Sequence, residues 1–283
     1  MHYRNITSAI SYPLSTLIAL TIGTQLLMSS QVIQAQQLPH SHARPDQVKI
    51  KHLHLDAKVN FDTKRISGSV TLTLDRIDPQ AKLQLDSDGL EIRSVKTESG
   101  QTLTFNQPPA RKGIGHGLIV DLPAATDQPA KVIVEYATDP TAAAVQWLSP
   151  EQTTDKKHPF LFTQSQAILA RTWVPCQDTP GVRMTYSAKL QVPKELLAVM
   201  SAANPQKKND TGIYEFEMKQ PIPSYLLALA VGDLKFVSVG ERSGVYAEPS
   251  VLKKAAWELA DTCLLYTSPS PRDQRGSRMP SSA

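Results

Sequence analysis

The sequence predicts a mostly β fold, a sandwich or barrel-like pair of sheets, and three observations support this. Short segments that alternate apolar and polar residues recur along the chain, Gly, Pro or Asp separates them, and helical periodicity first becomes convincing just before residue 262. Alternation places every second side chain on one face of a strand, and regularly spaced turn residues are typical of antiparallel sheets. About 220 residues separate the two atypical ends of the chain, which is enough for one large β domain.

The clearest predicted strands lie early in the chain. Segments 51–59 and 65–74 alternate regularly, and residues 62–64 between them predict a hairpin loop. The shared apolar faces would carry Leu53, Leu55, Ala57 and Val59 on the first strand, and Ile66, Gly68, Val70, Leu72 and Leu74 on the second. Further short strands are expected at 83–85, 91–95, 102–105, 118–120 and 131–136.

The second half of the chain continues the β pattern and then changes. Segments 185–192 and 212–218 are strand-like, whereas 225–231 is continuously apolar and fits either a buried strand or a short helix. The first convincing helix comes last, with Pro249 suited to its first turn. Its apolar stripe, at spacings i, i+3, i+4 and i+7, comprises Leu252, Ala255, Ala256 and Leu259.

Residues 1–35 are typical of a secretory signal peptide. An apolar stretch at 14–22 follows a weakly basic start, and Ile33-Gln34-Ala35 is a suitable cleavage site. Ser and Thr residues interrupt the apolar stretch, and Pro13, Thr24 and Gln25 flank it, so we expect no stable membrane anchor. Residues 36–46 are polar and predict a linker. The protein is therefore expected to be exported, with the bacterial periplasm as its compartment.

Residues 263–283 do not match the rest of the chain. They resemble a sequencing adapter and primer read as coding sequence, so we expect an artefactual, disordered tail. Of the formal charge of +4, this tail carries +2 and residues 1–35 carry +1, which leaves +1 for the remainder. Such a balance gives no electrostatic reason to expect a nucleic-acid or anionic-membrane partner.

Catalytic motifs are lacking. A zinc hydrolase commonly supplies two His one helical turn apart, but no two of the seven His are spaced i, i+4. His52 and His54 share one face of a predicted strand, where solvated histidines are far commoner than metal ligands. No metal site is therefore expected in this chain.

Two other features have structural interpretations. The glycine-rich segment 113–117 has no helix after it to present N–H groups to an anion, and it predicts a turn. Cys263 lies in the tail, which leaves Cys176 without a disulfide partner. With no assignable His beside it, Cys176 is expected to be buried and not nucleophilic.

The segment 162–180 is the most informative part of the sequence. If it opens as a strand, Gln164 and Gln166 project from the same face. Two neutral amide oxygens can accept hydrogen bonds from an ammonium group without cancelling its charge. The pattern alone also fits a polar strand face in contact with water, and both interpretations stay open.

Several motifs that follow one another along the chain favour the binding interpretation of the two glutamines. Residues 163–167 and 173–180, followed in order by 192–196, 221–234 and 245–249, resemble the bacterial relatives of leukotriene-A hydrolase, which are zinc aminopeptidases of the aminopeptidase N superfamily. The resemblance spans roughly residues 52–262. It implies a saddle-like antiparallel β-sandwich at 47–247 and, at 248–262, the first helix of a truncated thermolysin-like catalytic domain.

The resemblance also implies a function and its residues. It places Gln164, Gln166 and the adjoining Ala167 in the pocket for the amino end of a peptide substrate. The family's zinc ligands and catalytic residues lie downstream and none occurs here, so the chain alone is expected to be inactive and zinc-free, with the missing catalytic domain as its packing partner. The alternative, from another class, is a stand-alone exported β-sandwich that binds a ligand without catalysis.

Overall fold

The computed structural model describes residues 38–124, 130–241 and 243–261. The predicted signal peptide and the predicted tail lie outside these residues. No helix within the described ranges has the length and apolar character needed to cross a membrane. The described part is mostly β, as predicted, with a single short α-helix among its elements.

Most strands are short and follow one another closely. They are β1 (Val48–Asn60), β2 (Arg65–Arg76), β3 (Leu83–Asp86), β4 (Glu91–Thr97), β5 (Phe105–Asn106), β6 (Gly117–Val120), β7 (Ala130–Ala137), β8 (Val145–Leu148), β9 (Phe160–Thr163), β10 (Arg183–Gln191), β11 (Leu197–Met200), β12 (Ile213–Pro223), β13 (Leu229–Gly232), β14 (Lys235–Ser238) and β15 (Gly244–Ala247). Three 3-10 turns, η1 (Pro150–Gln152), η2 (Ala170–Thr172) and η3 (Ser224–Leu226), and the helix α2 (Leu252–Glu258) complete the described elements.

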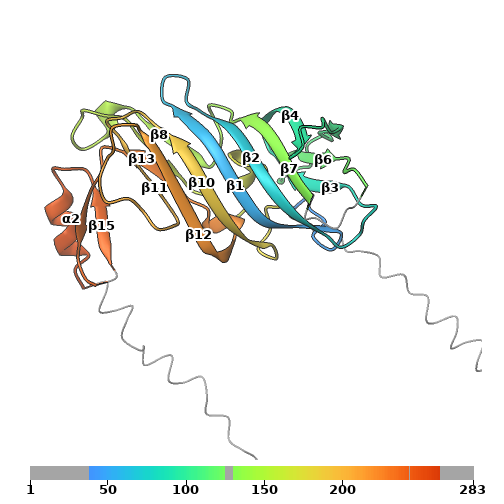
Figure 1. Cartoon of the computed structure of the whole chain (residues 1–283). Coiled ribbons are helices and arrows are strands. Elements are labelled where there is room, and N and C mark those ends of the chain that lie inside the picture. The colour runs from blue at the N-terminus through green and yellow to red at the C-terminus, as the bar shows by residue number, and fades with distance from the viewer. Residues whose placement is uncertain (1–37, 125–129, 242, 262–283) are drawn as a thin grey trace, which may run out of the picture. The chain divides into compact units, whose positions relative to one another are not determined.

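The largest sheet has six strands in the order β12-β10-β1-β2-β7-β4. Figure 1 shows its long central strands running side by side. The hairpin predicted at residues 62–64 joins β1 to β2 in an antiparallel pair. β1 and β10 are the exception to the antiparallel pattern, because they pair in parallel. A strand more than a hundred residues further along the chain is thereby fixed beside β1.

One face of this sheet is apolar and the other is polar. The predicted inward residues of β1 and β2 are buried, apart from the half-buried Gly68. A register shift between Ile50 and His52 puts Lys51 at a bulge, so that Val48 and Ile50 also point inward. At Gly68 a Cβ atom would lie 2.1 Å from the carbonyl oxygen of Asp56, so only glycine permits this close approach of the strands.

Three smaller sheets accompany the large one. Their strand orders are β11-β13-β9-β8, β3-β6-β5 and β14-β15. Buried residues of the first two join those of the six-stranded sheet in one contiguous apolar cluster. The inner faces of these three sheets therefore share one core, as expected for sheets that pack face to face.

Two predicted elements differ in the structure. The apolar run 225–231 divides, since its first residues belong to the turn η3 and its last three to β13. Pro249 precedes the helix and does not lie in its first turn, because α2 begins at Leu252. The helix contacts β14 and β15 but buries no residue fully, and Leu259 of its predicted stripe is 44% exposed.

Candidate functional site

The two glutamines singled out by the sequence lie on the loop that follows β9. The segment 162–180 opens as a strand, but this strand ends at Thr163, before both glutamines. The alternation nevertheless continues for three residues, with Gln164 and Gln166 exposed and Ser165 between them buried. Ala167 is also exposed, and its peptide bond with Gln166 is cis.

Inward-facing hydroxyl groups anchor this loop. The Ser165 hydroxyl donates a hydrogen bond to the carbonyl oxygen of Leu227 at 2.8 Å and accepts one from the indole N–H of Trp173 at 3.1 Å. Two residues earlier, the Thr163 hydroxyl accepts a bond from the backbone N–H of Leu229 at 2.9 Å. Because these two side chains are tied inward, the amide side chains that alternate with them, those of Gln164 and Gln166, are directed outward.

Backbone hydrogen bonds fix both ends of the loop. The N–H of Gln164 donates to the carbonyl oxygen of Ala144 at 2.8 Å, and the N–H of Leu169 donates to that of Ser165, also at 2.8 Å. The next residues form η2, whose three residues are all buried. The glutamines thus lie between a strand end and a buried turn.

A buried arginine lies directly behind this loop. Arg171 is 2% exposed, and its Nε donates to a carboxylate oxygen of Asp178 at 3.0 Å. Its two terminal nitrogens donate to the carbonyl oxygens of Ile114, His40 and Asp178 at 2.8, 2.9 and 3.0 Å. A guanidinium group offers five N–H donors in a fixed plane, so one side chain joins three distant segments of the chain.

The second carboxylate beside Arg171 is that of Asp86. We call Arg171, Asp178 and Asp86, with their hydrogen-bond partners, the buried polar network. Asp86 is 3.5 Å from Arg171 and accepts bonds from the Ser41 hydroxyl and from the backbone N–H groups of His42 and Asp178, at 2.6, 2.7 and 2.9 Å. Burial raises the pKa of Asp86, whereas Arg171 and these donors oppose that rise. A buried carboxylate is tolerated when it is paired and hydrogen-bonded in this way.

The network was not identified from the sequence. Arg171 follows the apolar run Ile168-Leu169-Ala170 and lies two residues before Trp173, and that context is the signal that would have indicated a buried charge. Its partners Asp86 and Asp178 carry no such signal, because nothing local to them shows that they meet.

Cys176 lies beside the same network and is fully buried, as predicted. Burial raises the pKa of its thiol well above the ordinary value, and the nearby Asp178 and Asp86 raise it further. A protonated thiol is a poor nucleophile and a poor metal ligand. Cys176 is therefore part of the core.

The described residues do not fit a catalytic or structural zinc centre, which needs at least three protein ligands. Residues 38–124, 130–241 and 243–261 contain no group of three or more His, Cys, Asp or Glu side chains placed to hold a metal ion. His52 and His54, which share a face of β1 as predicted, hydrogen-bond to hydroxyl groups of β10. No chemical step through zinc can be derived from these residues.

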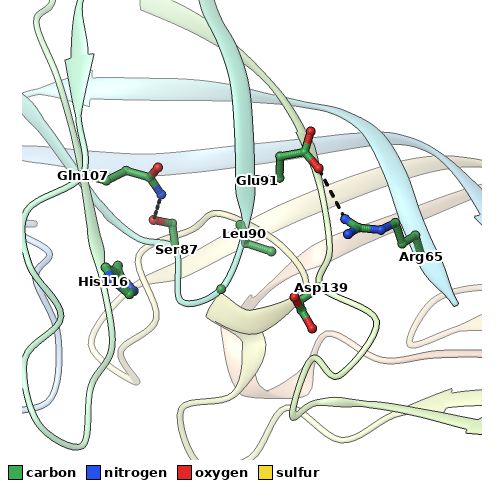
Figure 2. Close-up of a pocket in the computed structure, with 8 residues that line it drawn as sticks. Arg65, Ser87, Leu90, Glu91, Gln107, His116 and Asp139 are labelled. Carbon is green, nitrogen blue, oxygen red and sulfur yellow. Dashed lines mark hydrogen bonds and ion pairs between the residues drawn. The ribbon is translucent and has the colours of Figure 1, made fainter. Parts of the chain in front are cut away.

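A separate hollow of about 480 Å³ is lined by other residues (Figure 2). Its charges are largely paired, since Arg65 lies 3.3 Å from Glu91 and also donates to the carbonyl oxygen of Thr138. The amide of Gln107 donates to the Ser87 hydroxyl at 3.4 Å. Polar groups that satisfy one another in this way offer little unused capacity for a ligand.

The glutamine loop differs from this hollow, because its two amides are exposed and the loop that carries them is held by buried hydrogen bonds. Each amide offers a carbonyl oxygen that can accept a hydrogen bond and an NH₂ group that can donate two. Neither carries charge, so a bound cation keeps its own. Each amide can therefore hydrogen-bond a cationic group that reaches the loop.

Comparisons with known proteins show which family the chain resembles. Residues 48–226 match the family model described as the peptidase M1 N-terminal domain. Leukotriene A-4 hydrolase of Xenopus laevis is 40% identical over 232 residues, which cover 79% of this chain and 38% of that protein. Leucine aminopeptidase 2 of Pyricularia oryzae is 38% identical over 231 residues, which cover 79% of this chain and 37% of the relative. The chain thus spans less than two fifths of these relatives.

Solved structures agree with this result. The structure of native yeast LTA4 hydrolase superimposes with a TM-score of 0.74 and 31% identity, and covers 90% of this chain and 38% of the other. An M1 zinc metallopeptidase from Deinococcus radiodurans gives a TM-score of 0.55 at 22% identity, over 75% of this chain and 49% of the other, which shows a shared fold.

Proposed function

Because this chain belongs to the peptidase M1 family through its N-terminal domain, we propose that it is the N-terminal β domain of an exported zinc aminopeptidase. The observation that carries the proposal is the pair of exposed amides, Gln164 and Gln166, on a loop anchored by buried hydrogen bonds. In this proposal the domain forms the part of the substrate pocket that receives the peptide's free amino end.

The chemistry of the two amides supports this role. The α-ammonium group of a peptide has three N–H donors, and the carbonyl oxygens of Gln164 and Gln166 can accept two of them. Ala167 continues the exposed loop with a side chain too small to obstruct the approach. Holding the amino end fixes the position of the first peptide bond, and position alone accounts for a large share of many rate enhancements.

The zinc ion and the groups that activate water would lie on another domain. That division is supported by the match of residues 48–226 to the peptidase M1 N-terminal domain and by the 38% of the Xenopus relative that the chain spans. Zinc would polarise the scissile carbonyl group and activate water there. The helix α2 and its exposed Trp257 and Leu259 would pack against that domain.

Comparison of the chain with the parent gene product tests this proposal. We expect the parent to bind zinc and to cleave aminoacyl-p-nitroanilides until a chelator removes the metal. The chain as written should fold into a β domain by circular dichroism, retain no zinc after dialysis against a weak chelator and show no turnover. One zinc per chain with metal-dependent turnover in the chain itself, or a parent without aminopeptidase activity, would contradict the proposal.

A further inference from the structure

The polar face of the six-stranded sheet carries a pair of histidines that the proposed function does not use. His52 and His54 are separated by one residue on β1, and both are half-buried there. β10 runs parallel to β1 and places Thr185 opposite His52 and Ser187 opposite His54. Partners in register lie on the same side of a sheet, so the two imidazoles and the two hydroxyl groups form one cluster.

The two imidazole rings converge on one point. The Ser187 oxygen lies 3.1 Å from Nε2 of His52 and 2.7 Å from Nδ1 of His54. Two ring nitrogens from different residues are therefore both within hydrogen-bond reach of a single oxygen atom. An ion bound by both rings would take the place of the Ser187 hydroxyl as their common partner, with nitrogen–metal distances of about 2.0–2.1 Å.

A neighbouring hydroxyl group sets the orientation of His52. Nδ1 of His52 lies 2.7 Å from the Thr185 oxygen, and the Thr185 hydroxyl donates to the carbonyl oxygen of Lys51. With its proton so engaged, Thr185 accepts a bond from Nδ1–H of His52, which leaves the Nε2 lone pair directed at Ser187. Metal-binding histidines commonly donate their second ring N–H to such a partner, which fixes tautomer and orientation.

Charges of both signs surround the cluster, since the Glu217 carboxylate on β12 and the Lys131 ammonium group on β7 both act on His52. Glu217 on β12 is opposite Ser187 in register, on the same face of the sheet. Its carboxylate is exposed and lies 3.5 Å from Lys219, so it is near the cluster but is not a third ligand. The described ranges offer no three-ligand group here, and water would complete the coordination.

We propose that His52 and His54 form a binding site for a divalent transition-metal ion, with Cu²⁺ bound more tightly than Ni²⁺ or Zn²⁺. Imidazole nitrogen suits these ions, and affinity at a given nitrogen site is highest for Cu²⁺. A site with two protein ligands is weaker than a closed structural zinc site, which has four. The ion is therefore exchangeable and is not needed for folding.

The chain supplies a matched control with the same spacing. His40 and His42 are also separated by one residue, but Nε2 of His40 faces Thr179 whereas Nε2 of His42 faces the carbonyl oxygen of Gly115. Their rings are bound to different partners and do not share a target. The two histidine pairs have the same spacing in the sequence. They differ because only the ring nitrogens of His52 and His54 approach a single atom.

The experiment uses the full chain with Cys263→Ser, so that no thiol at that position competes for metal. The probe is Cu²⁺ as its iminodiacetate complex, which leaves coordination positions for two imidazoles. We expect one equivalent to bind by calorimetry, with a nitrogen pattern from two histidines in electron paramagnetic resonance. His52→Ala or His54→Ala should each weaken binding by at least about tenfold, whereas His40→Ala and His42→Ala should leave the affinity unchanged.

Two further variants separate metal binding from a general effect on the sheet. Thr185→Val should weaken binding severalfold, since it frees the His52 ring, while Ser187→Ala should retain it, since the ion replaces that hydroxyl. Circular dichroism and thermal unfolding of each variant verify that the sheet is intact. Equal binding by wild type and His52→Ala, or binding abolished only by His40→Ala or His42→Ala, would overturn the proposal.

Discussion

The six-stranded sheet and the glutamine loop are stabilised by different kinds of contact. In the sheet, alternating apolar side chains of β1 and β2 enter a continuous core, and neighbours along the strands supply most of the pattern. In the loop, Ser165 and Arg171 hold the chain through buried hydrogen bonds to residues far away in the sequence. Apolar burial is non-directional and tolerates adjustment, whereas a buried polar network requires every partner. The geometry of the loop is therefore more narrowly defined than the packing of the sheet, and a single substitution disrupts it more easily.

The largest expected effect comes from removing the centre of the buried polar network. Arg171→Met leaves Asp86 and Asp178 buried without their cation, which should destabilise the fold by about 3–5 kcal/mol. Urea unfolding followed by circular dichroism measures the change. Arg93→Met, at an exposed arginine that pairs with Glu91, should change stability by less than about 0.5 kcal/mol. Similar values for the two variants would remove the contrast between the regions.

A cavity in the sheet should cost somewhat less and act differently. Leu72 is fully buried on β2, and Leu72→Ala should lower the unfolding free energy by about 2–5 kcal/mol. None of the hydrogen bonds that anchor the glutamine loop involves Leu72. The parent enzyme carrying this change should therefore keep its kcat/KM at temperatures where it remains folded. A large fall in kcat/KM with an intact fold would show that the loop depends on the sheet's packing.

The reverse result is expected at Ser165. Ser165→Ala leaves the carbonyl oxygen of Leu227 and the indole N–H of Trp173 without their buried partner, which should cost about 1–3 kcal/mol. Because the same hydroxyl directs the glutamines outward, kcat/KM of the parent enzyme on aminoacyl substrates should also fall. Ser69→Ala, on the polar face of β2, is the control for both measurements. Lower stability with unchanged kcat/KM would separate the anchor from the site.

The smallest effect on stability concerns Cys176. Burial raises the pKa of its thiol well above the ordinary 9.0, so the folded protein keeps this proton at a pH where the unfolded chain releases it. The unfolding free energy should therefore fall as pH rises above about 9. With Cys263→Ser as background, Ellman's reagent at pH 8 should react on the order of a hundredfold more slowly with the folded than with the urea-unfolded chain. Equal rates would place the thiol in solvent.

The same contrast explains what the sequence could predict. The faces of β1 and β2 and the hairpin between them follow from local alternation, and the structure confirms them. The bulge at Lys51 and the parallel pairing of β1 with β10 could not be derived, because they depend on a partner strand far away in the chain. For the same reason the sequence did not indicate that Asp86 and Asp178 meet at Arg171, the residue that supports the glutamine loop.

The end of β9 shows what the sequence could and could not predict for single residues. The alternation of Thr163, Gln164, Ser165 and Gln166 predicted that the two glutamines share one face, and both are exposed. It did not predict that the strand stops at Thr163, since the later residues bond to Leu227 and Ala144 and not to a neighbouring strand. The role of these glutamines in substrate binding stays a proposal.

The most direct test of the account is kcat/KM of the parent enzyme with Gln166→Ala, on a substrate with a free α-amino group. Loss of a hydrogen bond to a charged group costs roughly 1.5–3 kcal/mol, so kcat/KM should fall about ten- to a hundredfold. Zinc content and thermal stability should not change, because the side chain is exposed. Gln220→Ala, at an exposed glutamine of β12, should behave as wild type. An unchanged kcat/KM in Gln166→Ala would contradict the account and would return the two glutamines to a solvated surface.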